Sequence, residues 1–137
     1  MSFRKEKYLG FKESTLSPQT DFLTGKSNED IRSLFRETLY GGVHGFCFSI
    51  YEEGQKPGDI ISAEQVRKRM QILKPYAAWV RSFSCVEGNE LVPKIAKEMG
   101  IKCLVGAWLG SDKEKNRVEI DNLISLAKEG YVDIAVV

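Results

Sequence analysis

Apolar residues gather in four short runs in the second two thirds of the chain, and a segment with helical spacing separates each run from the next. The runs are rich in β-branched and aromatic residues and cover residues 43–50, 77–84, 101–108 and 132–137. Nearly continuous apolar runs of this length are typical of strands buried on both faces. Because strands alternate with helices, the pattern predicts βαβ units, a parallel sheet and right-handed crossovers.

Three segments between these runs have apolar residues at helical spacing and recognisable ends. Ser62 with Gln65 forms a capping box before the first, which ends at Pro75. The second covers residues 91–99, with a proline in its first turn and a glycine after its end. The third begins at Ser111 or Asp112 and carries apolar residues at 118, 120, 123, 124 and 127. We therefore expect three crossover helices.

The first 26 residues are polar, rich in Ser, Thr and Lys, and show no periodicity. They predict a polar N-terminal extension, followed by one domain over residues 27–137. Ser27 and Asp30 resemble a capping pair, and apolar residues follow at positions 31, 34, 35 and 39. This spacing predicts a helix that precedes the first strand.

The four predicted strands begin on average roughly 30 residues apart, so eight such units would need about 240 residues, close to the ~250 of a (β/α)8 barrel. One interpretation is therefore α/β, the first half of a (β/α)8 TIM barrel with four parallel strands and three crossover helices. The other is a complete open α/β domain with four strands. The apolar end of the sequence, Val136 and Val137, favours the first interpretation, a truncated barrel.

Composition and charge bear on the partners and the location of the protein, but they do not identify a function. The chain has 137 residues, 42% hydrophobic and 28% charged, and 20 basic against 19 acidic residues give a net charge of +1. This balance gives no argument for a nucleic acid or an anionic membrane as partner. The sequence has no apolar run long enough for a signal peptide or a membrane span, so a cytoplasmic location is expected.

The cysteines and the histidine give no argument for a cofactor. Cys47, Cys85 and Cys103 lie in apolar runs without CxxC spacing, and we expect buried thiols in a reducing compartment. His44, the single histidine, is not spaced to share a metal ion with them. We expect neither metal nor cofactor.

In parallel α/β folds, ligands bind at the carboxyl ends of the strands. The loops there carry carboxylates, amides and aromatic residues: Tyr51, Glu52, Glu53, Gln55, Ser84, Cys85, Glu87, Asn89, Trp108, Ser111 and Asp112. They hold no histidine and no phosphate-binding glycine pattern. This composition favours a neutral ligand with a ring, such as a sugar.

Individual residues in this set have two interpretations each. Arg81 is a charge inside an apolar strand, which fits either a ligand contact or an internal ion pair. Trp108 could stack on a sugar ring or pack under a loop. Glu52 and Glu53 fit a solvated loop better than an acid/base pair, and no two carboxylates are placed convincingly for glycoside hydrolysis. His44 and Asp133, at the amino ends of strands, fit structural roles.

Four segments resemble a known family. They are GFCFSIYEEGQKPGD at 45–59, WVRSFSCVEGNEL at 79–91, AKEMGIKCLVGAWLGSDKEKNRVEIDNLI at 96–124 and LAKEGYVDIAVV at 126–137. Together they are similar to the amino-terminal half of glycoside hydrolase family 17-like proteins, the β-1,3-glucanase type. The resemblance covers about residues 43–137.

The resemblance implies a (β/α)8 barrel that acts on β-glucan linkages with retention through two glutamates. The first follows the fourth strand in a Gly-Asn-Glu sequence and the second lies on strand seven, and neither position is present here, so no catalytic residue is assigned. Tyr51, Arg81 and Trp108 match sugar-binding positions, whereas Phe48 replaces a tyrosine of many relatives and loses its hydroxyl.

From the resemblance we expect the chain to be inactive alone as a hydrolase, with β-glucan or an oligosaccharide as the ligand of the full-length form. The alternative is a non-catalytic module that binds carbohydrate or self-associates through an exposed edge of the fourth strand.

Overall fold

The computed structural model describes residues 23–137, so most of the predicted extension lies outside the described residues. The chain separates into two compact units, residues 1–37 and 38–137, which we describe one at a time. Helix α3 covers Asn28–Tyr40 and begins where the capping pair predicts. The Ser27 hydroxyl accepts from the Asp30 amide (3.2 Å), and Asp30 Oδ2 accepts from the Ser27 amide (3.0 Å). The Ser27 hydroxyl also donates to Asp30 Oδ2 at 2.7 Å, and this bond, together with the one from the Ser27 amide, holds the pKa of Asp30 below its ordinary value.

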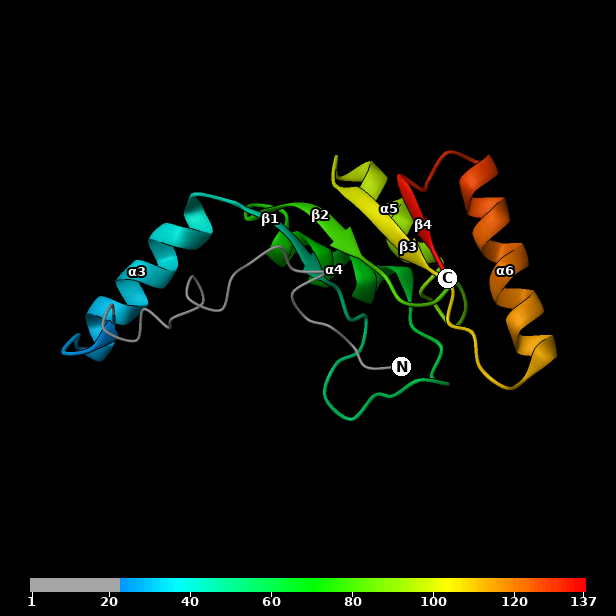
Figure 1. The fold of residues 1–137 in the computed structure, drawn as a ribbon, viewed down its shortest axis with the longest axis horizontal. Coiled ribbons are helices and arrows are strands. Elements are labelled where there is room, and N and C mark those ends of the chain that lie inside the picture. Colours follow the sequence, from blue (N-terminus) through cyan, green and yellow to red (C-terminus); the bar gives the residue numbers. More distant parts are fainter. Residues whose placement is uncertain (1–22) are drawn as a thin grey trace, which may run out of the picture. The chain divides into compact units, whose positions relative to one another are not determined.

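The second unit is built on one parallel sheet of four strands in the order β1-β2-β3-β4 (Figure 1). The strands are β1 (Val43–Cys47), β2 (Ala77–Arg81), β3 (Lys102–Gly106) and β4 (Ile134–Val136). The predicted α/β class with parallel strands is therefore confirmed for this unit. Each strand is shorter than its apolar run, and the run of β1 continues into a loop in which Phe48 and Ile50 are buried.

Helices α4 (Ala63–Leu73), α5 (Leu91–Glu98) and α6 (Lys113–Lys128) connect successive strands. The Ser62 hydroxyl caps α4 by accepting from the Gln65 amide at 3.2 Å, as the sequence predicts. Asp112 caps α6, and its Oδ1 accepts from the amides of Glu114 (3.0 Å) and Lys115 (3.1 Å). The sequence left Ser111 and Asp112 as alternative caps for α6, and the structure shows that Asp112 is the cap.

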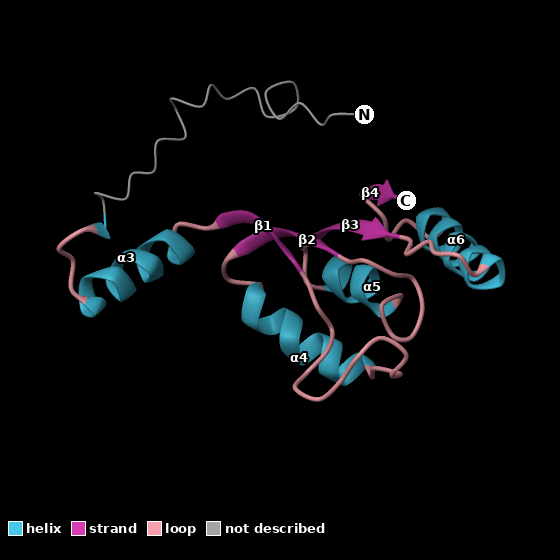
Figure 2. Cartoon of the chain, turned by 60° about the horizontal axis from the view of Figure 1, so that its bottom comes forward, coloured by secondary structure: helices cyan, strands magenta, loops and turns pink. Residues whose placement is uncertain are grey.

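The core lies between the sheet and these helices. Figure 2 shows α4 and α5 below the strands, and α6 contributes Leu123 and Leu126 to the same apolar cluster. Residues that are register partners in neighbouring parallel strands share a face of the sheet. Val80 of β2 and its partner Cys103 of β3 are both nearly fully buried, so this is the face that the helices cover.

None of the connecting helices α4, α5 and α6 covers the opposite face of the sheet. Arg81, Leu104 and Ile134 are aligned across three strands on this face, and Arg81 and Ile134 are exposed. Strand β4 is at the edge of the sheet, with Ile134 46% exposed. A complete open α/β domain would need a covered fourth strand, and the described residues do not provide one.

One of the three expected buried thiols is corrected and the other two are confirmed. Cys47 is exposed, whereas Cys85 and Cys103 are buried, because Cys47 belongs to the uncovered face. Burial, together with the charges of Glu119 and Glu90, raises the pKa of Cys85 to about 12. Burial and the charge of Asp133 likewise raise the pKa of Cys103 to about 12.

Asp133 and His44, at the amino ends of β4 and β1, make structural contacts. Asp133 Oδ2 accepts from the Cys103 amide at 2.8 Å and joins the start of β4 to β3, in agreement with the role expected for it. His44 stacks on Trp79 with ring centroids 5.8 Å apart.

Candidate functional site

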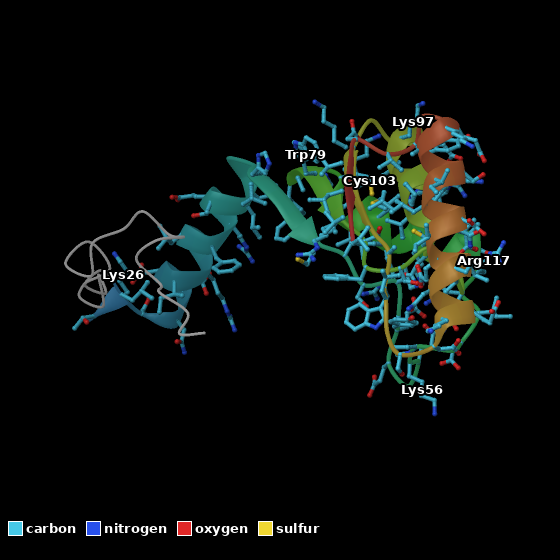
Figure 3. All side chains as sticks on the ribbon, turned by 45° about the vertical axis from the view of Figure 1, so that its right-hand side comes forward. Lys26, Lys56, Trp79, Lys97, Cys103 and Arg117 are labelled. Atoms are coloured by element: carbon cyan, nitrogen blue, oxygen red, sulfur yellow. The ribbon has the colours of Figure 1, made fainter. Side chains whose placement is uncertain are left out.

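A cavity of about 290 Å³ lies where β1, β2 and β3 end. It is bounded by residues that follow these strands and by the first turns of α6. Its lining is Phe48, Ser49, Ile50, Tyr51, Pro57, Phe83, Ser84, Glu87, Asn89, Trp108, Lys115 and Glu119. In Figure 3, Lys56 marks the carboxyl-end loop beside this cavity, and Lys97 lies near the opposite end of the unit. The cavity therefore occupies the ligand-binding end of a parallel α/β fold.

Two of the three sugar-binding residues assigned by resemblance line this cavity together. Tyr51 follows β1 and is partly buried against the core, and Trp108 follows β3 and is 64% exposed. Exposure of this size is incompatible with packing under a loop, the alternative considered for Trp108. Phe48 from the segment after β1 and Phe83 from the segment after β2 also line the cavity. Aromatic faces thus come from all three strands that end at the cavity.

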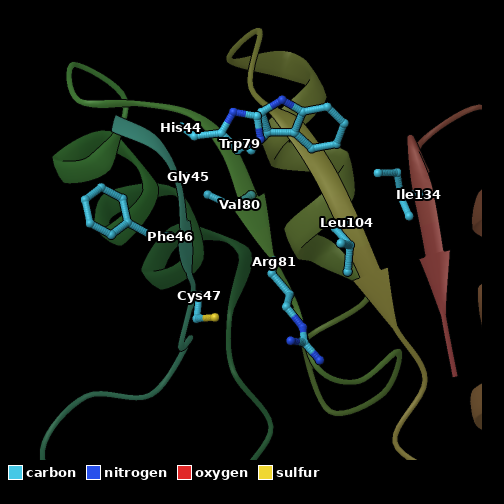
Figure 4. Close-up of a pocket in the computed structure, with 9 residues that line it drawn as sticks. All are labelled: His44, Gly45, Phe46, Cys47, Trp79, Val80, Arg81, Leu104 and Ile134. Carbon is cyan, nitrogen blue, oxygen red and sulfur yellow. The ribbon is translucent and has the colours of Figure 1, made fainter. Parts of the chain in front are cut away.

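Arg81, the third residue, lies outside this cavity. It lines a second cavity of about 240 Å³ on the open face of the sheet, with Trp79, Leu104 and Ile134 (Figure 4). Its guanidinium carbon lies 4.9 Å from the centre of the Phe83 ring. Within residues 23–137, Arg81 forms no ion pair, so the internal ion pair considered for it is not found there. Phe83 thus contacts Arg81 and also lines the first cavity.

The loop after β2 is held in an unusual backbone conformation. Glu87 has φ of 60° and Gly88 has φ of 97°, a region that favours glycine. The Glu87 carbonyl accepts from the Ile61 amide at 3.2 Å, and its carboxylate accepts from the Gly58 amide at 2.9 Å. Lys115 Nζ lies 3.3 Å from the same carboxylate. These contacts join the loops after β1 and β2 to α6 and hold the cavity walls together.

Glu119 of α6 is the most buried charged group at the site, with no exposed surface. Its Oε1 accepts from the Ser84 hydroxyl, and its Oε2 accepts from the Cys85 amide at 2.6 Å. One turn further along α6, Asn122 Nδ2 donates to the Cys85 carbonyl at 2.8 Å. The helix therefore fixes the backbone at the point where β2 enters the cavity.

The carboxylates that line the cavity are not arranged as a catalytic pair. Glu87 binds Lys115 and the Gly58 amide, and Glu119 is buried with two donors. Glu52 and Glu53 are exposed and do not line the cavity, as expected for a solvated loop. Among residues 23–137 no group of three His, Cys, Asp or Glu side chains could hold a metal ion. The arrangement suits binding of a ring through aromatic contacts and hydrogen bonds.

Comparisons of the chain with protein-family models, with curated proteins and with solved structures found no match. Within residues 23–137, no helix has both the length and the apolar character that crossing a bilayer requires.

The sequence did not single out Glu119, Phe83 or Lys115. Glu119 carries a usable signal, since it lies in the i, i+4, i+7 row with Leu123 and Leu126, the buried row of α6. The other large apolar residues of α6, Val118, Ile120 and Ile124, are 37–49% exposed. A carboxylate in the buried row of a helix needs partners, and here these are Ser84 and the Cys85 amide.

Proposed function

We propose that the cavity at the carboxyl ends of β1–β3 binds β-glucan oligosaccharides, and that residues 43–137 correspond to the sugar-binding first half of a retaining glycoside hydrolase barrel. The observation that carries the proposal is the exposed indole of Trp108 beside Tyr51 and Phe83 in one cavity. Aromatic faces pack on the apolar C–H face of a pyranose ring. The cavity of about 290 Å³ is near the lower limit of ordinary ligand sites, a size suited to a short segment of glycan.

The sheet supports the barrel part of this proposal. Right-handed crossovers between strands in sequential order place every connecting helix on the same face. Here α4, α5 and α6 all pack into one core, and the other face carries Trp79 and Arg81 without a covering helix in the described unit. A doubly wound sheet instead reverses its strand order and has helices on both faces.

The proposed activity of the chain as given is binding without hydrolysis. A retaining mechanism needs two carboxyl groups about 5–5.5 Å apart, one as acid/base and one as nucleophile. The cavity carboxylates, Glu87 and Glu119, are engaged by Lys115 and by Ser84 with Cys85. Assays for reducing sugar with a β-1,3-glucan should therefore give no release. Release of sugar by the pure chain, abolished by Arg81→Ala, would contradict this part of the proposal.

Calorimetric titration with a β-1,3-linked glucose pentasaccharide tests the binding. Trp108→Ala should weaken binding about tenfold or more, equal to about 1.4 kcal/mol, because the stacking face is lost. Leu109→Ala is the matched control, since Leu109 is the next residue, is 40% exposed and does not line the cavity. Equal affinities for both variants would contradict the role of Trp108.

A second candidate function is self-association through the edge of the sheet. Ile134 and Val137 are 46% and 77% exposed at β4, and Ile120 and Ile124 are exposed on α6. Unpaired edge strands pair readily with another chain. Sedimentation over a wide concentration range should detect a dimer that Ile134→Lys disrupts. A monomer at every concentration would contradict this candidate.

A further inference from the structure

Glu119 fixes the direction in which the Ser84 hydroxyl, on the segment after β2, points its proton. Ser84 follows β2, lines the cavity, and donates its hydroxyl proton to Glu119. A carboxylate has only acceptor sites, whereas a serine hydroxyl has one donor and two acceptor sites. While the Ser84 hydroxyl donates its proton to Glu119, Ser84 can only accept hydrogen bonds from other groups.

One of the acceptor sites of Ser84 is already used. The Val86 amide donates to the Ser84 oxygen at 3.3 Å, within the same turn of the loop. Glu119 cannot be satisfied by water, because none of its surface is exposed, and Lys115, one turn earlier on α6, is directed to Glu87 at 3.3 Å. The Ser84 proton is therefore the natural partner of Oε1, and a single lone pair of Ser84 is left.

We propose that Glu119 is a positioning residue that makes Ser84 an obligatory hydrogen-bond acceptor, so that the ligand must donate a hydroxyl or N–H group at this point of the cavity. The inference rests on the proposed function only for the identity of the ligand. It assigns a polarity to the site: a ligand with a hydroxyl at this position binds, and an analogue with an acceptor-only group there is rejected. Such an analogue binds more weakly because its acceptor would face the Ser84 oxygen, another acceptor, with no proton between them.

The Glu119→Gln variant reverses this polarity. The Cys85 amide still needs an acceptor, which the Gln carbonyl supplies, so the Gln amino group faces Ser84 and donates to it. The Ser84 hydroxyl then no longer donates to residue 119, and its proton turns toward the cavity. Asp121→Asn is the matched control, since Asp121 is an exposed acid on the same helix and pairs with Arg117 at 3.8 Å.

The first measurement needs no ligand. In the wild-type chain, NMR should detect the Ser84 hydroxyl proton as a slowly exchanging signal that is close to the Glu119 side chain. The signal should persist in Asp121→Asn and be lost to exchange in Glu119→Gln. A Ser84 proton that exchanges rapidly in the wild-type chain would overturn the inference without reference to any variant.

The second measurement uses methyl β-D-glucoside and its four analogues with fluorine in place of one hydroxyl. Fluorine can accept but cannot donate, so one analogue should bind the wild-type chain about tenfold more weakly. This penalty should disappear in Glu119→Gln and in Ser84→Ala, which keeps the bond between Glu119 and the Cys85 amide. An unchanged penalty in both variants would overturn the inference. If the wild-type chain binds neither methyl β-D-glucoside nor the pentasaccharide, the proposed function fails, and the proton measurement alone decides the role of Glu119.

Discussion

Gly88→Ala tests whether the loops after β1 and β2 are in direct contact beside the cavity. Gly88 has φ of 97°, and a Cβ atom built there would lie 2.5 Å from the carbonyl oxygen of Ile61 and 3.0 Å from its Cβ. The Ile61 carbonyl cannot move away freely, because the amide of the same residue donates to the Glu87 carbonyl at 3.2 Å. The substitution should therefore both strain the backbone and separate the two loops.

The magnitude has two parts. A positive φ costs a residue with a side chain about 1–2 kcal/mol, and overpacking of this kind costs about 1–3 kcal/mol. Substitution of glycine also restricts the unfolded chain, which stabilises the folded state by about 0.4–1 kcal/mol. The net loss in free energy of unfolding should be about 2–4 kcal/mol for Gly88→Ala.

Two other glycines separate these contributions. Gly54 has φ of 83° with no atom within 4 Å of the added Cβ, so Gly54→Ala should cost about 1 kcal/mol from backbone strain alone. Gly110 has open space and no positive φ, so Gly110→Ala should change stability by less than about 1 kcal/mol. Urea unfolding followed by tryptophan fluorescence measures all three. If Gly88→Ala and Gly54→Ala agree within about 0.5 kcal/mol, the loop contact is refuted.

Three further predictions concern the buried thiols and a helix cap. Under native conditions, iodoacetamide should modify Cys47 and spare Cys85 and Cys103, as peptide mapping would show; modification of all three at one rate would contradict their burial. Because the pKa of each buried thiol is raised from 9.0 to about 12, the unfolded chain loses these protons first. Stability should thus fall between about pH 9 and 12 by about 1.4 kcal/mol per pH unit for each thiol, and urea unfolding should show a shallower fall for Cys85→Ala. Asp112→Ala should cost about 1 kcal/mol by thermal unfolding and Ser111→Ala much less; equal losses would refute the assignment of the cap.

Local signals in the sequence predict most of the fold. The capping pairs at Ser27 and Ser62 mark where α3 and α4 begin, and the alternation of runs gives the parallel strand order. Such signals work because each depends on neighbours in the chain. The burial of a strand face depends instead on which elements lie against it. Cys47 was therefore predicted wrongly, since its run is apolar but none of the helices α4, α5 and α6 covers its face.

The site was predictable in part for the same reason. Tyr51 and Trp108 meet in one cavity because parallel strands end at one edge of a sheet, a rule that sequence can apply. The position of Arg81 depends on side-chain direction, since it points from a strand toward Phe83 on the open face. The helical row that Glu119 shares with Leu123 and Leu126 signals its burial, but its partner Ser84 lies 35 positions away, and no local pattern identifies that contact.

Tryptophan fluorescence tests the central claim most directly, because the two tryptophans of the chain lie in different places. Trp108 lines the cavity at the strand ends and Trp79 lies on the open face of the sheet. Addition of a β-1,3-linked glucose pentasaccharide to Trp79→Phe, in which Trp108 is the reporter, should change the emission saturably. The same titration of Trp108→Phe should leave the emission of Trp79 unchanged. No saturable change in Trp79→Phe, or a change only in Trp108→Phe, would contradict sugar binding at this cavity.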